Sequence, residues 1–412
     1  MTNDNDKSPF SPIKIGPLEL RNRLIRTGAF EGRIINGLPS KSMSAYHGEM
    51  AAGGVGLTTV AYCAISRDGR TFPNQIVLSP ESVPHMRAVA DAVHRAGGAI
   101  SAQITHSGSY NFLPRLEDTR FPRTSTTGFY EEGFLGGRPF KVAMTSSDME
   151  KTADRFASGA QLAREAGFDA VEIHMGHGYL LSQFLSPAIN HRRDSFGGAD
   201  PADRVRFPAM VLRRVLDAVG RDLAVTCKVA SYEGCKGGTT GEDAAEIVKV
   251  LEAEGAHLIV LTGGLNKQSV WVMFGSKFPF AEMRLQAKGF RRLAFARLDR
   301  QQPQDLKFRE MYLLEHSRKV RAAVKLPLAY LGGVRSLDNV KQLMDEGFEC
   351  VAMARPLVHD LAFVNKLRDG SISCSGCDSR NECVTNMHGP AGTQCVLTPR
   401  DDLDLNRVPA GD

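Results

Sequence analysis

The sequence has no apolar run long enough to cross a membrane as a helix and no strong excess of either charge. A spanning helix needs about 20 consecutive apolar residues, and every apolar run here is shorter. The 51 Lys and Arg residues nearly balance the 46 Asp and Glu residues, which leaves a formal net charge of +5. Such a charge is a weak argument for nucleic acid, and an anionic cofactor or substrate explains it equally well. We therefore expect neither a membrane nor a nucleic-acid partner.

The sequence also lacks a secretory signal and a disulfide framework. Its first residues are polar and acidic rather than signal-like. Eight cysteines in 412 residues do not make a disulfide scaffold. We therefore expect a cytoplasmic protein in a reducing compartment, where clustered thiolates indicate metal or redox chemistry. The content of 42% hydrophobic and 24% charged residues is typical of a globular protein and excludes a disordered chain.

Short β-branched runs alternate with amphipathic helical patterns along most of the chain. The sequence predicts strands at 23–28, 56–64, 99–105, 170–174, 223–229, 257–262, 327–331 and 350–354. It predicts helices at 82–96, 148–166, 203–219, 242–254, 312–324 and 337–346, and several of these end at glycine, which favours a left-handed cap. Such alternation predicts a parallel sheet, and eight strands predict an α/β fold of the (β/α)8, or TIM-barrel, type.

Two long stretches and the C-terminal end break this alternation. Residues 107–145 are rich in Gly, Pro and Arg, and residues 263–305 carry Trp271 and phenylalanines among basic residues. Both follow a barrel strand, so we expect long βα-loops at the active-site face, the second acting as a lid or a partner surface. The barrel is expected to span 8–369, and 370–412 to form a short Cys-rich extension and tail.

Polar and small residues are predicted at the C-terminal ends of several strands, where such barrels hold their active sites. Gly332 and Gly333 follow the seventh strand, and Ala354 and Arg355 follow the eighth. Small residues let backbone N–H groups approach phosphate oxygens, and an arginine adds a bidentate contact. This pattern predicts a phosphate site, while a plain turn with a surface arginine is the alternative.

The segment 171–198, VEIHMGHGYLLSQFLSPAINHRRDSFGG, is the most distinctive part of the sequence. It places His174, His177 and Tyr179 at and just after a strand end, and Glu172 within that strand. Two neutral imidazoles can donate hydrogen bonds to an anionic oxygen, and a phenol can supply a proton. The alternatives are a pair of satisfied histidines at the barrel rim and a metal fragment without an evident third ligand.

This segment resembles the old yellow enzyme family of FMN-dependent ene-reductases, particularly the bacterial NADH:flavin oxidoreductase and 2,4-dienoyl-CoA reductase branch. The resemblance continues in PLELRNR at 17–23, QITH at 103–106, LGGVR at 331–335 and MAR at 353–355. These motifs follow the family's order and cover about residues 8–397. No G-x-G-x-x-G in a strand–helix context occurs, so the chain looks like a single-barrel form without the C-terminal dinucleotide-binding domains of some relatives.

The resemblance implies an FMN across the barrel mouth, with NADH or NADPH as reductant. The residues that would contact the flavin ring come from the first strands and the fifth, and they are Thr27, Gly28, Ala29, Tyr62, Gln103 and Lys228. The phosphate would lie against Gly332, Gly333, Ala354 and Arg355. A cation at Lys228 would stabilise the anionic reduced flavin, although the family usually has Arg there, whose planar fork Lys lacks.

The resemblance also implies how a substrate would react. His174 and His177 would bind its carbonyl or nitro oxygen, and Tyr179 would give a proton to Cα after hydride reaches Cβ. The leading prediction is an FMN-dependent, ene-reductase-type oxidoreductase that takes hydride from NAD(P)H and reduces an activated C=C bond of an α,β-unsaturated carbonyl or related compound. The sequence specifies a small-molecule substrate no further, and it leaves open whether the chain forms a homo-oligomer.

Four cysteines near the C-terminus, Cys374, Cys377, Cys383 and Cys395, form a candidate metal site. Their order resembles the [4Fe–4S] motif that follows the barrel in dienoyl-CoA reductase and trimethylamine dehydrogenase relatives. The middle spacing is longer here than in those relatives. Tetrahedral zinc would accept the same sulfurs, and a tail without metal is the third reading.

Two other functions fit parts of the sequence. One is a flavin-dependent dehydrogenase or dealkylase of an amine or ring, related to trimethylamine dehydrogenase, in which Tyr62 would face an alkylammonium. The neutral donors His174 and His177 favour reduction over that reading. The other is a non-catalytic flavin- or metal-binding subunit, which would not need Gln103, the histidine pair and Tyr179 together.

Overall fold

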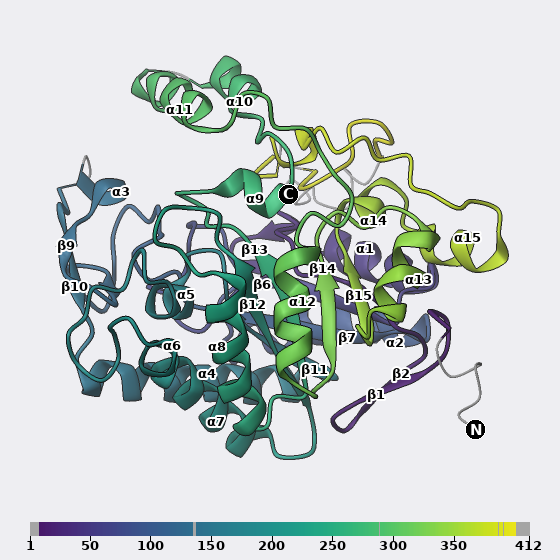
Figure 1. Cartoon of the computed structure of the whole chain (residues 1–412), viewed down its shortest axis with the longest axis horizontal. Coiled ribbons are helices and arrows are strands. Elements are labelled where there is room, and N and C mark those ends of the chain that lie inside the picture. The colour runs from purple at the N-terminus through teal and green to yellow at the C-terminus, as the bar shows by residue number, and fades with distance from the viewer. Residues whose placement is uncertain (1–7, 135–136, 288, 386, 390, 401–412) are drawn as a thin grey trace, which may run out of the picture.

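A closed barrel of parallel strands forms the centre of the computed structural model, which describes residues 8–134, 137–287, 289–385, 387–389 and 391–400 (Figure 1). The barrel strands in chain order are β3 (Leu24–Arg26), β6 (Leu57–Ala64), β7 (Ala99–Thr105), β11 (Ala170–Met175), β12 (Ala224–Tyr232), β13 (Leu258–Gly263), β14 (Leu328–Leu331) and β15 (Cys350–Met353). β15 pairs back with β3 and closes the ring. All eight predicted strands are present, so the TIM-barrel prediction is confirmed.

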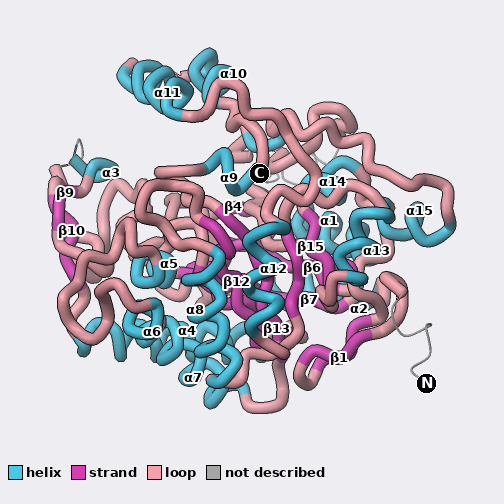
Figure 2. The backbone as a smooth tube through the Cα atoms, in the orientation of Figure 1, coloured by secondary structure: helices cyan, strands magenta, loops and turns pink. Residues whose placement is uncertain are grey.

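Helices surround the barrel (Figure 2). They include α1 (Lys41–Ala52), α2 (Val83–Arg95), α4 (Ser146–Glu165), α7 (Arg206–Val219), α8 (Gly241–Ala253), α12 (Leu314–Ala323) and α13 (Leu337–Asp345). Thr145, Thr240 and Ser336 begin α4, α8 and α13 with capping boxes that satisfy free N–H groups of the first turn. The helix predicted at 203–219 is divided into α6 (Pro201–Arg204) and α7, and Pro208 lies in the first turn of α7, where its missing N–H is tolerated.

A short hairpin closes the end of the barrel where the strands begin. Its strands β1 (Ile13–Ile15) and β2 (Leu18–Leu20) pair antiparallel. Ile15 and Leu20 are buried in a cluster with the first residues of several barrel strands, among them Leu57 and Ala170. The opposite end, where the strands finish, therefore carries the long connections (Figure 1).

Those long connections contain more secondary structure than their sequences suggested. Residues 107–145 hold β8 (Arg123–Thr124), β9 (Gly128–Phe129), α3 (Glu131–Phe134) and β10 (Phe140–Ala143). Residues 263–305 hold α9 (Val270–Phe274), α10 (Phe280–Gln286) and α11 (Phe290–Gln301). α10 and α11 stand away from the barrel (Figure 1) and leave Leu285 and Leu293 exposed. Because no core selects one apolar face on these helices, the sequence shows little helical periodicity there.

The remaining elements follow three of the barrel strands, β3, β11 and β15. They are β4 (Ile34–Ile35), β5 (Leu38–Pro39), α5 (Leu180–Leu185), α14 (Arg355–His359), α15 (Phe363–Asp369) and a 3-10 turn at Glu382–Val384. The predicted boundary between 369 and 370 falls at the end of α15 and stays a prediction, and residues 401–412 of the predicted tail lie outside the described residues.

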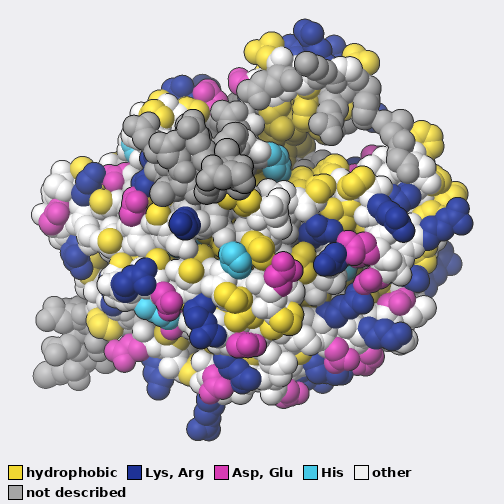
Figure 3. Space-filling view, turned by 180° about the vertical axis from the view of Figure 1, so that it is seen from behind, with side chains coloured by type: hydrophobic (Ala, Val, Ile, Leu, Met, Phe, Trp, Pro, Cys, Tyr) yellow, Lys and Arg dark blue, Asp and Glu magenta, His cyan; other side chains and the backbone are white. Residues whose placement is uncertain are grey.

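Two observations concern the membrane and the surface charge. Within the described ranges, no helix combines the length and the apolar character that a membrane crossing requires. On the face seen in Figure 3, Lys and Arg side chains are interspersed with Asp and Glu.

Candidate functional site

The ends of β7, β11 and β12 bring three buried polar side chains together. Glu172 Oε1 accepts a hydrogen bond of 2.6 Å from Gln103 Nε2 and lies 3.2 Å from Lys228 Nζ. All three residues are at most 3% exposed. Burial lowers the pKa of Lys228, and the Glu172 carboxylate opposes that shift. The sequence predicted that Gln103 and Lys228 contact the flavin. The contact of Glu172 with both side chains depends on the register in which β11 pairs with β7 and β12.

The end of β3 lies directly against this group. Lys228 Nζ donates a 3.3 Å hydrogen bond to the Gly28 carbonyl oxygen. A Cβ on Gly28 would lie 2.6 Å from Gln103 Nε2, so a larger residue there would push the Gln103 amide out of its present position. Thr27 is buried, and its Oγ1 has no hydrogen-bond partner among the described residues. Ala29 follows Gly28, and its carbonyl oxygen accepts a bond of 3.2 Å from Arg26.

These observations fit the FMN that the sequence predicted. An unpartnered buried hydroxyl normally finds a partner, and a flavin heteroatom would supply one for Thr27. The Gln103 amide donates one N–H to Glu172, which leaves its oxygen to accept from a ligand. Gly28 has no side chain to obstruct a flat ring, and Lys228 and Gln103 beside it can bind the polar edge of that ring.

His174, His177 and Tyr179 lie together at the end of β11. The ring centroids of the two histidines are 4.9 Å apart, and the His174 and Tyr179 rings are 4.8 Å apart. Gly176 N donates to His174 Nδ1 over 3.2 Å, which leaves Nε2 of a neutral ring to carry the proton. His177 Nε2 lies 2.9 Å from Thr262 Oγ1 of β13. His174 pairs with Lys228 in the strand register, so the histidines and the predicted flavin residues share one end of the barrel.

Burial sets the charge of these three groups. It lowers the pKa of His177 to about 3 and the pKa of His174 well below its ordinary value, and the Lys228 ammonium adds to both shifts. Burial raises the pKa of Tyr179. Near neutral pH the site therefore presents two neutral imidazoles and a protonated phenol. His177 also has a φ of +62°, in the left-handed region that non-glycine residues rarely adopt.

An aromatic cluster extends from Tyr179 away from the histidines. Its buried members are Tyr62 and Tyr179 with Ala61, and the partly buried rings packed on them are those of Phe30, Phe72 and Tyr110. The Tyr62 and Tyr179 ring centroids are 5.2 Å apart. The sequence placed Tyr62 at the flavin edge but gave no sign of Phe72 and Tyr110, because they lie on loops after β6 and β7 without periodicity.

The predicted phosphate residues adjoin one another at the ends of β14 and β15. Gly333 has a φ of +73°, and a Cβ there would lie 2.8 Å from the Tyr312 ring, so this turn also requires glycine. Arg355 begins α14, directly after Ala354, and its guanidinium bonds to the Phe274 carbonyl oxygen at 2.8 Å and to Asn381 Oδ1 at 2.7 Å.

Gly332 precedes Gly333 at this corner, and Arg335 follows two residues later. Arg335 was part of a sequence motif but not of the predicted site. Its buried Nε has no partner among the described residues, which fits an anion at this corner.

The four C-terminal cysteines differ in their surroundings. Cys374 is exposed, and Cys395 is buried with its Sγ 3.3 Å from His359 Nδ1. Burial raises the pKa of Cys383 to about 11, which favours its thiol form. In the part of the chain that the structure describes, no three His, Cys, Asp or Glu side chains form a group that could hold a metal ion. The described geometry therefore does not support the predicted cluster of Cys374, Cys377, Cys383 and Cys395.

The long spacing between Cys377 and Cys383 has a physical explanation. Asn381, which lies between them, is buried and bonds to Arg355, Ser276 and the Lys277 carbonyl oxygen. The extra residues thus hold the extension against the barrel loops.

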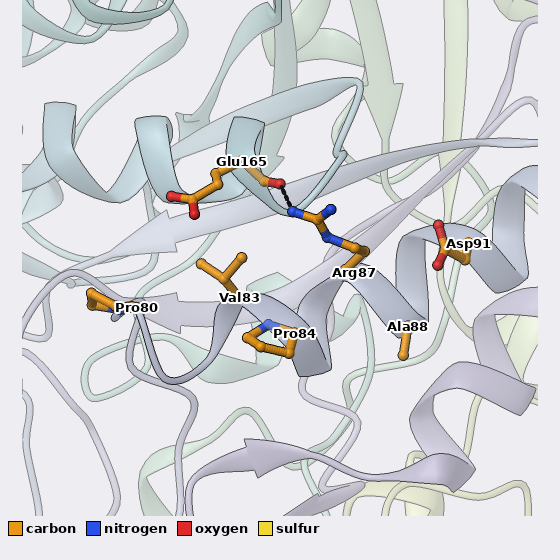
Figure 4. Close-up of a pocket in the computed structure, with 7 residues that line it drawn as sticks. All are labelled: Pro80, Val83, Pro84, Arg87, Ala88, Asp91 and Glu165. Carbon is orange, nitrogen blue, oxygen red and sulfur yellow. Dashed lines mark hydrogen bonds between the residues drawn. The ribbon is translucent and has the colours of Figure 1, made fainter.

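A surface hollow lies elsewhere, on the outer helices (Figure 4). It is lined by Pro80, Val83, Pro84, Arg87, Ala88, Asp91 and Glu165, from α2, the turn before it and the end of α4. Arg87 donates to the Glu165 carbonyl oxygen across it. None of the predicted site residues lines this hollow.

Comparison with known proteins relates the chain to oxidoreductases. A profile of the NADH:flavin oxidoreductase / NADH oxidase family matches residues 8–266. The chain is 36% identical over 415 residues to a 4,4'-dithiodibutanoate disulfide reductase of Rhodococcus erythropolis, a match that covers 99% of each chain. It is 29% identical over 381 residues to an NADH oxidase of Thermoanaerobacter brockii, covering 89% of this chain and 53% of that one. The chain thus spans about half the length of this second relative.

A solved structure has the same architecture. The old yellow enzyme homologue from Zymomonas mobilis matches with a TM-score of 0.68 and 20% identity, over 95% of this chain and 98% of that one. At this identity the likeness concerns the fold alone.

Proposed function

The chain belongs to the NADH:flavin oxidoreductase / NADH oxidase family, and from that premise we propose that it reduces the activated C=C bond of an α,β-unsaturated carbonyl or related compound with NAD(P)H. Membership confirms the resemblance to the old yellow enzyme family and, with it, FMN-dependent oxidoreduction. The choice of substrate bond and the residue roles below are the proposal.

One observation supports the proposal most. Two neutral histidines and a protonated tyrosine lie beside a buried Gln103–Glu172–Lys228 group at the same end of the barrel. FMN, when bound, accepts hydride from NAD(P)H and passes it to a substrate. Thr27, Gly28 and Gln103 would bind its ring, and Lys228 would place a positive charge beside it.

His174 and His177 would bind the substrate's electron-withdrawing oxygen through their N–H groups. A neutral imidazole suits this role because its N–H donates a hydrogen bond without adding a buried positive charge beside Lys228. The two rings would hold the alkene's activating group in a fixed position and draw electron density from Cβ, where hydride arrives.

Tyr179 would deliver the proton that completes the reduction. Hydride adds to Cβ, the electron pair of the C=C bond moves toward the bound oxygen, and the Tyr179 hydroxyl protonates Cα. The tyrosinate then regains a proton from water. The net reaction consumes NAD(P)H, one proton and the alkene, and it yields NAD(P)+ and the saturated product.

The test is anaerobic. The purified protein is reconstituted with FMN, reduced with one equivalent of NADPH or NADH, and mixed with 2-cyclohexenone while the visible flavin absorbance is followed. We expect the absorbance to bleach with the nicotinamide and to return with the enone, with cyclohexanone as product. A reduced flavin that does not reoxidise with this or other enones would refute the C=C assignment.

A second candidate substrate is the disulfide of a small carboxylic acid. It is favoured by the 36% identity across the whole length of a relative that reduces 4,4'-dithiodibutanoate. The balanced reaction takes one hydride from NAD(P)H and one proton, and it cleaves the S–S bond to two thiols. Replacing the enone by 4,4'-dithiodibutanoate in the same assay, with thiols measured by a colorimetric reagent, distinguishes the two.

Oxidation of an amine is the remaining alternative from the sequence. An amine dehydrogenase would bleach the flavin with an alkylamine alone, without nicotinamide. We expect no such bleaching, because neutral donors at His174 and His177 offer an alkylammonium nothing to bind.

A further inference from the structure

The C-terminal extension packs against the end of the first barrel strand. Thr393 donates from its backbone N–H to the Glu31 carbonyl oxygen over 2.7 Å, and from its Oγ1 to the Phe30 carbonyl oxygen over 2.6 Å. A Cβ on Gly32 would lie 1.9 Å from the Met387 carbonyl oxygen. The two backbones are therefore in direct contact, and glycine at 32 permits it.

A second set of contacts fixes the extension on its other side. Asn381 is 1% exposed and donates to Ser276 Oγ over 2.7 Å and to the Lys277 carbonyl oxygen over 2.8 Å. Its Oδ1 accepts from Arg355 over 2.7 Å. Both flanks are thus hydrogen-bonded to barrel loops, and of the residues between them 387–389 are described at this end of the barrel.

That segment brings His388 to the aromatic cluster. The His388 ring centroid is 5.3 Å from that of Phe30 and 4.5 Å from that of Phe72, edge-on to the latter. Phe30 is 5.7 Å from Tyr62, which is 5.2 Å from Tyr179. A continuous row of rings thus leads from the proposed proton donor to His388.

The ring nitrogens of His388 are available to bind a ligand. Its side chain is exposed, and neither ring nitrogen bonds to another described residue. Partial burial lowers the pKa of His388, so near pH 7 the ring is neutral, with one N–H donor and one acceptor. Among apolar rings, such a donor is suited to an oxygen of a ligand.

We propose that His388 is a substrate-binding residue that donates a hydrogen bond to an oxygen at the end of the substrate remote from the reacting bond. The site then selects compounds with a carbonyl or carboxylate at that end. This orientation of the substrate rests on the proposed function, in which the reacting bond lies at His174 and Tyr179.

The experiment measures binding without turnover. The FMN-loaded full-length protein is titrated, without nicotinamide, with 4-phenyl-3-buten-2-one and with its para-carboxy derivative, whose carboxylate lies across the phenyl ring from the C=C bond. Dissociation constants are taken from the change in flavin absorbance. His388→Phe keeps a ring but removes the N–H, and His388→Asn keeps a donor. His85→Phe, at an exposed position on α2, is the matched control.

We expect wild type to bind the para-carboxy compound more tightly than the parent enone. His388→Phe should weaken that binding about 10-fold, the effect of one hydrogen bond to a charged group, and change parent binding less than about 2-fold. His388→Asn should restore part of the loss, and His85→Phe should change neither.

Three results would overturn the inference: equal wild-type affinity for the two compounds, an equal effect of His388→Phe on both, or no effect of it on either. A wild-type enzyme that binds as expected but does not reduce the enone would refute the proposed function while leaving the role of His388 intact.

Discussion

Replacing Glu172 by Gln removes the negative charge next to the buried ammonium of Lys228. The two groups are 3.2 Å apart, and both side chains are almost fully buried. At an effective dielectric constant of about 20, two unit charges at that distance attract by about 5 kcal/mol. Part of this is offset by desolvation, and the loss of one partner of a buried pair typically costs about 3–5 kcal/mol. We expect about 3 kcal/mol, because Lys228, whose pKa burial already lowers, can release its proton in the variant.

The assay is urea unfolding of the FMN-loaded protein, followed by far-ultraviolet circular dichroism. Glu346→Gln is the matched control, since Glu346 pairs with Arg318 at 2.6 Å on the surface, where Arg318 is 56% exposed. A surface pair contributes about 0–1 kcal/mol. The double variant Glu172→Gln/Lys228→Met should recover most of the loss, because no uncompensated charge remains. If Glu172→Gln and Glu346→Gln destabilise the protein equally, the reasoning from burial and pairing is wrong.

Three further predictions follow from the site. Tyr179→Phe should slow enone reduction about 100-fold in stopped-flow traces while flavin reduction by NADPH is unchanged; equal enone rates would exclude it as the proton donor. Thr27→Val should weaken FMN binding about 5-fold without lowering the urea midpoint, because the Thr27 hydroxyl has no partner among the described residues. Thr58→Val, the control, breaks a 2.8 Å contact with His47 and should lower the urea midpoint. Unchanged FMN affinity of Thr27→Val would contradict the assignment of Thr27 to the flavin. Since the folded chain keeps His177 neutral to about pH 3 while the unfolded chain binds its proton below about pH 6.5, the free energy of unfolding should fall as pH drops through that window. His177→Asn should flatten that slope by at most about 1.4 kcal/mol per pH unit, and an unchanged slope would mean that His177 titrates normally.

The barrel was predictable because short stretches of sequence determine its strands and helices. Each barrel strand is a short buried run, each helix packed on the barrel has an apolar face, and the spacing between them allows little other than parallel pairing. The positions of Gln103, His174 and Lys228 were predictable for the same reason, since all strand ends of a parallel barrel meet at one face.

The contacts that distinguish this site were not predictable in that way. Glu172 bonds to Gln103, 69 positions away in the chain, and this pairing depends on strand register. His388 lies in a segment without periodicity, and its approach to Phe30 depends on hydrogen bonds made by Thr393 and Asn381. The cysteine spacing suggested a metal site, but spacing alone does not show what the residues between the cysteines bind.

The hairpin β1–β2 has a consequence for how this protein can change. Ile15 and Leu20 fill the barrel end opposite the site, so residues there affect stability without touching a ligand. Effects of substitutions more than about 7–10 Å apart without shared partners usually add. A directed-evolution library at Phe30, Phe72 and His388 could therefore alter specificity while stabilising substitutions accumulate in the hairpin, and the two sets can be selected separately and then combined.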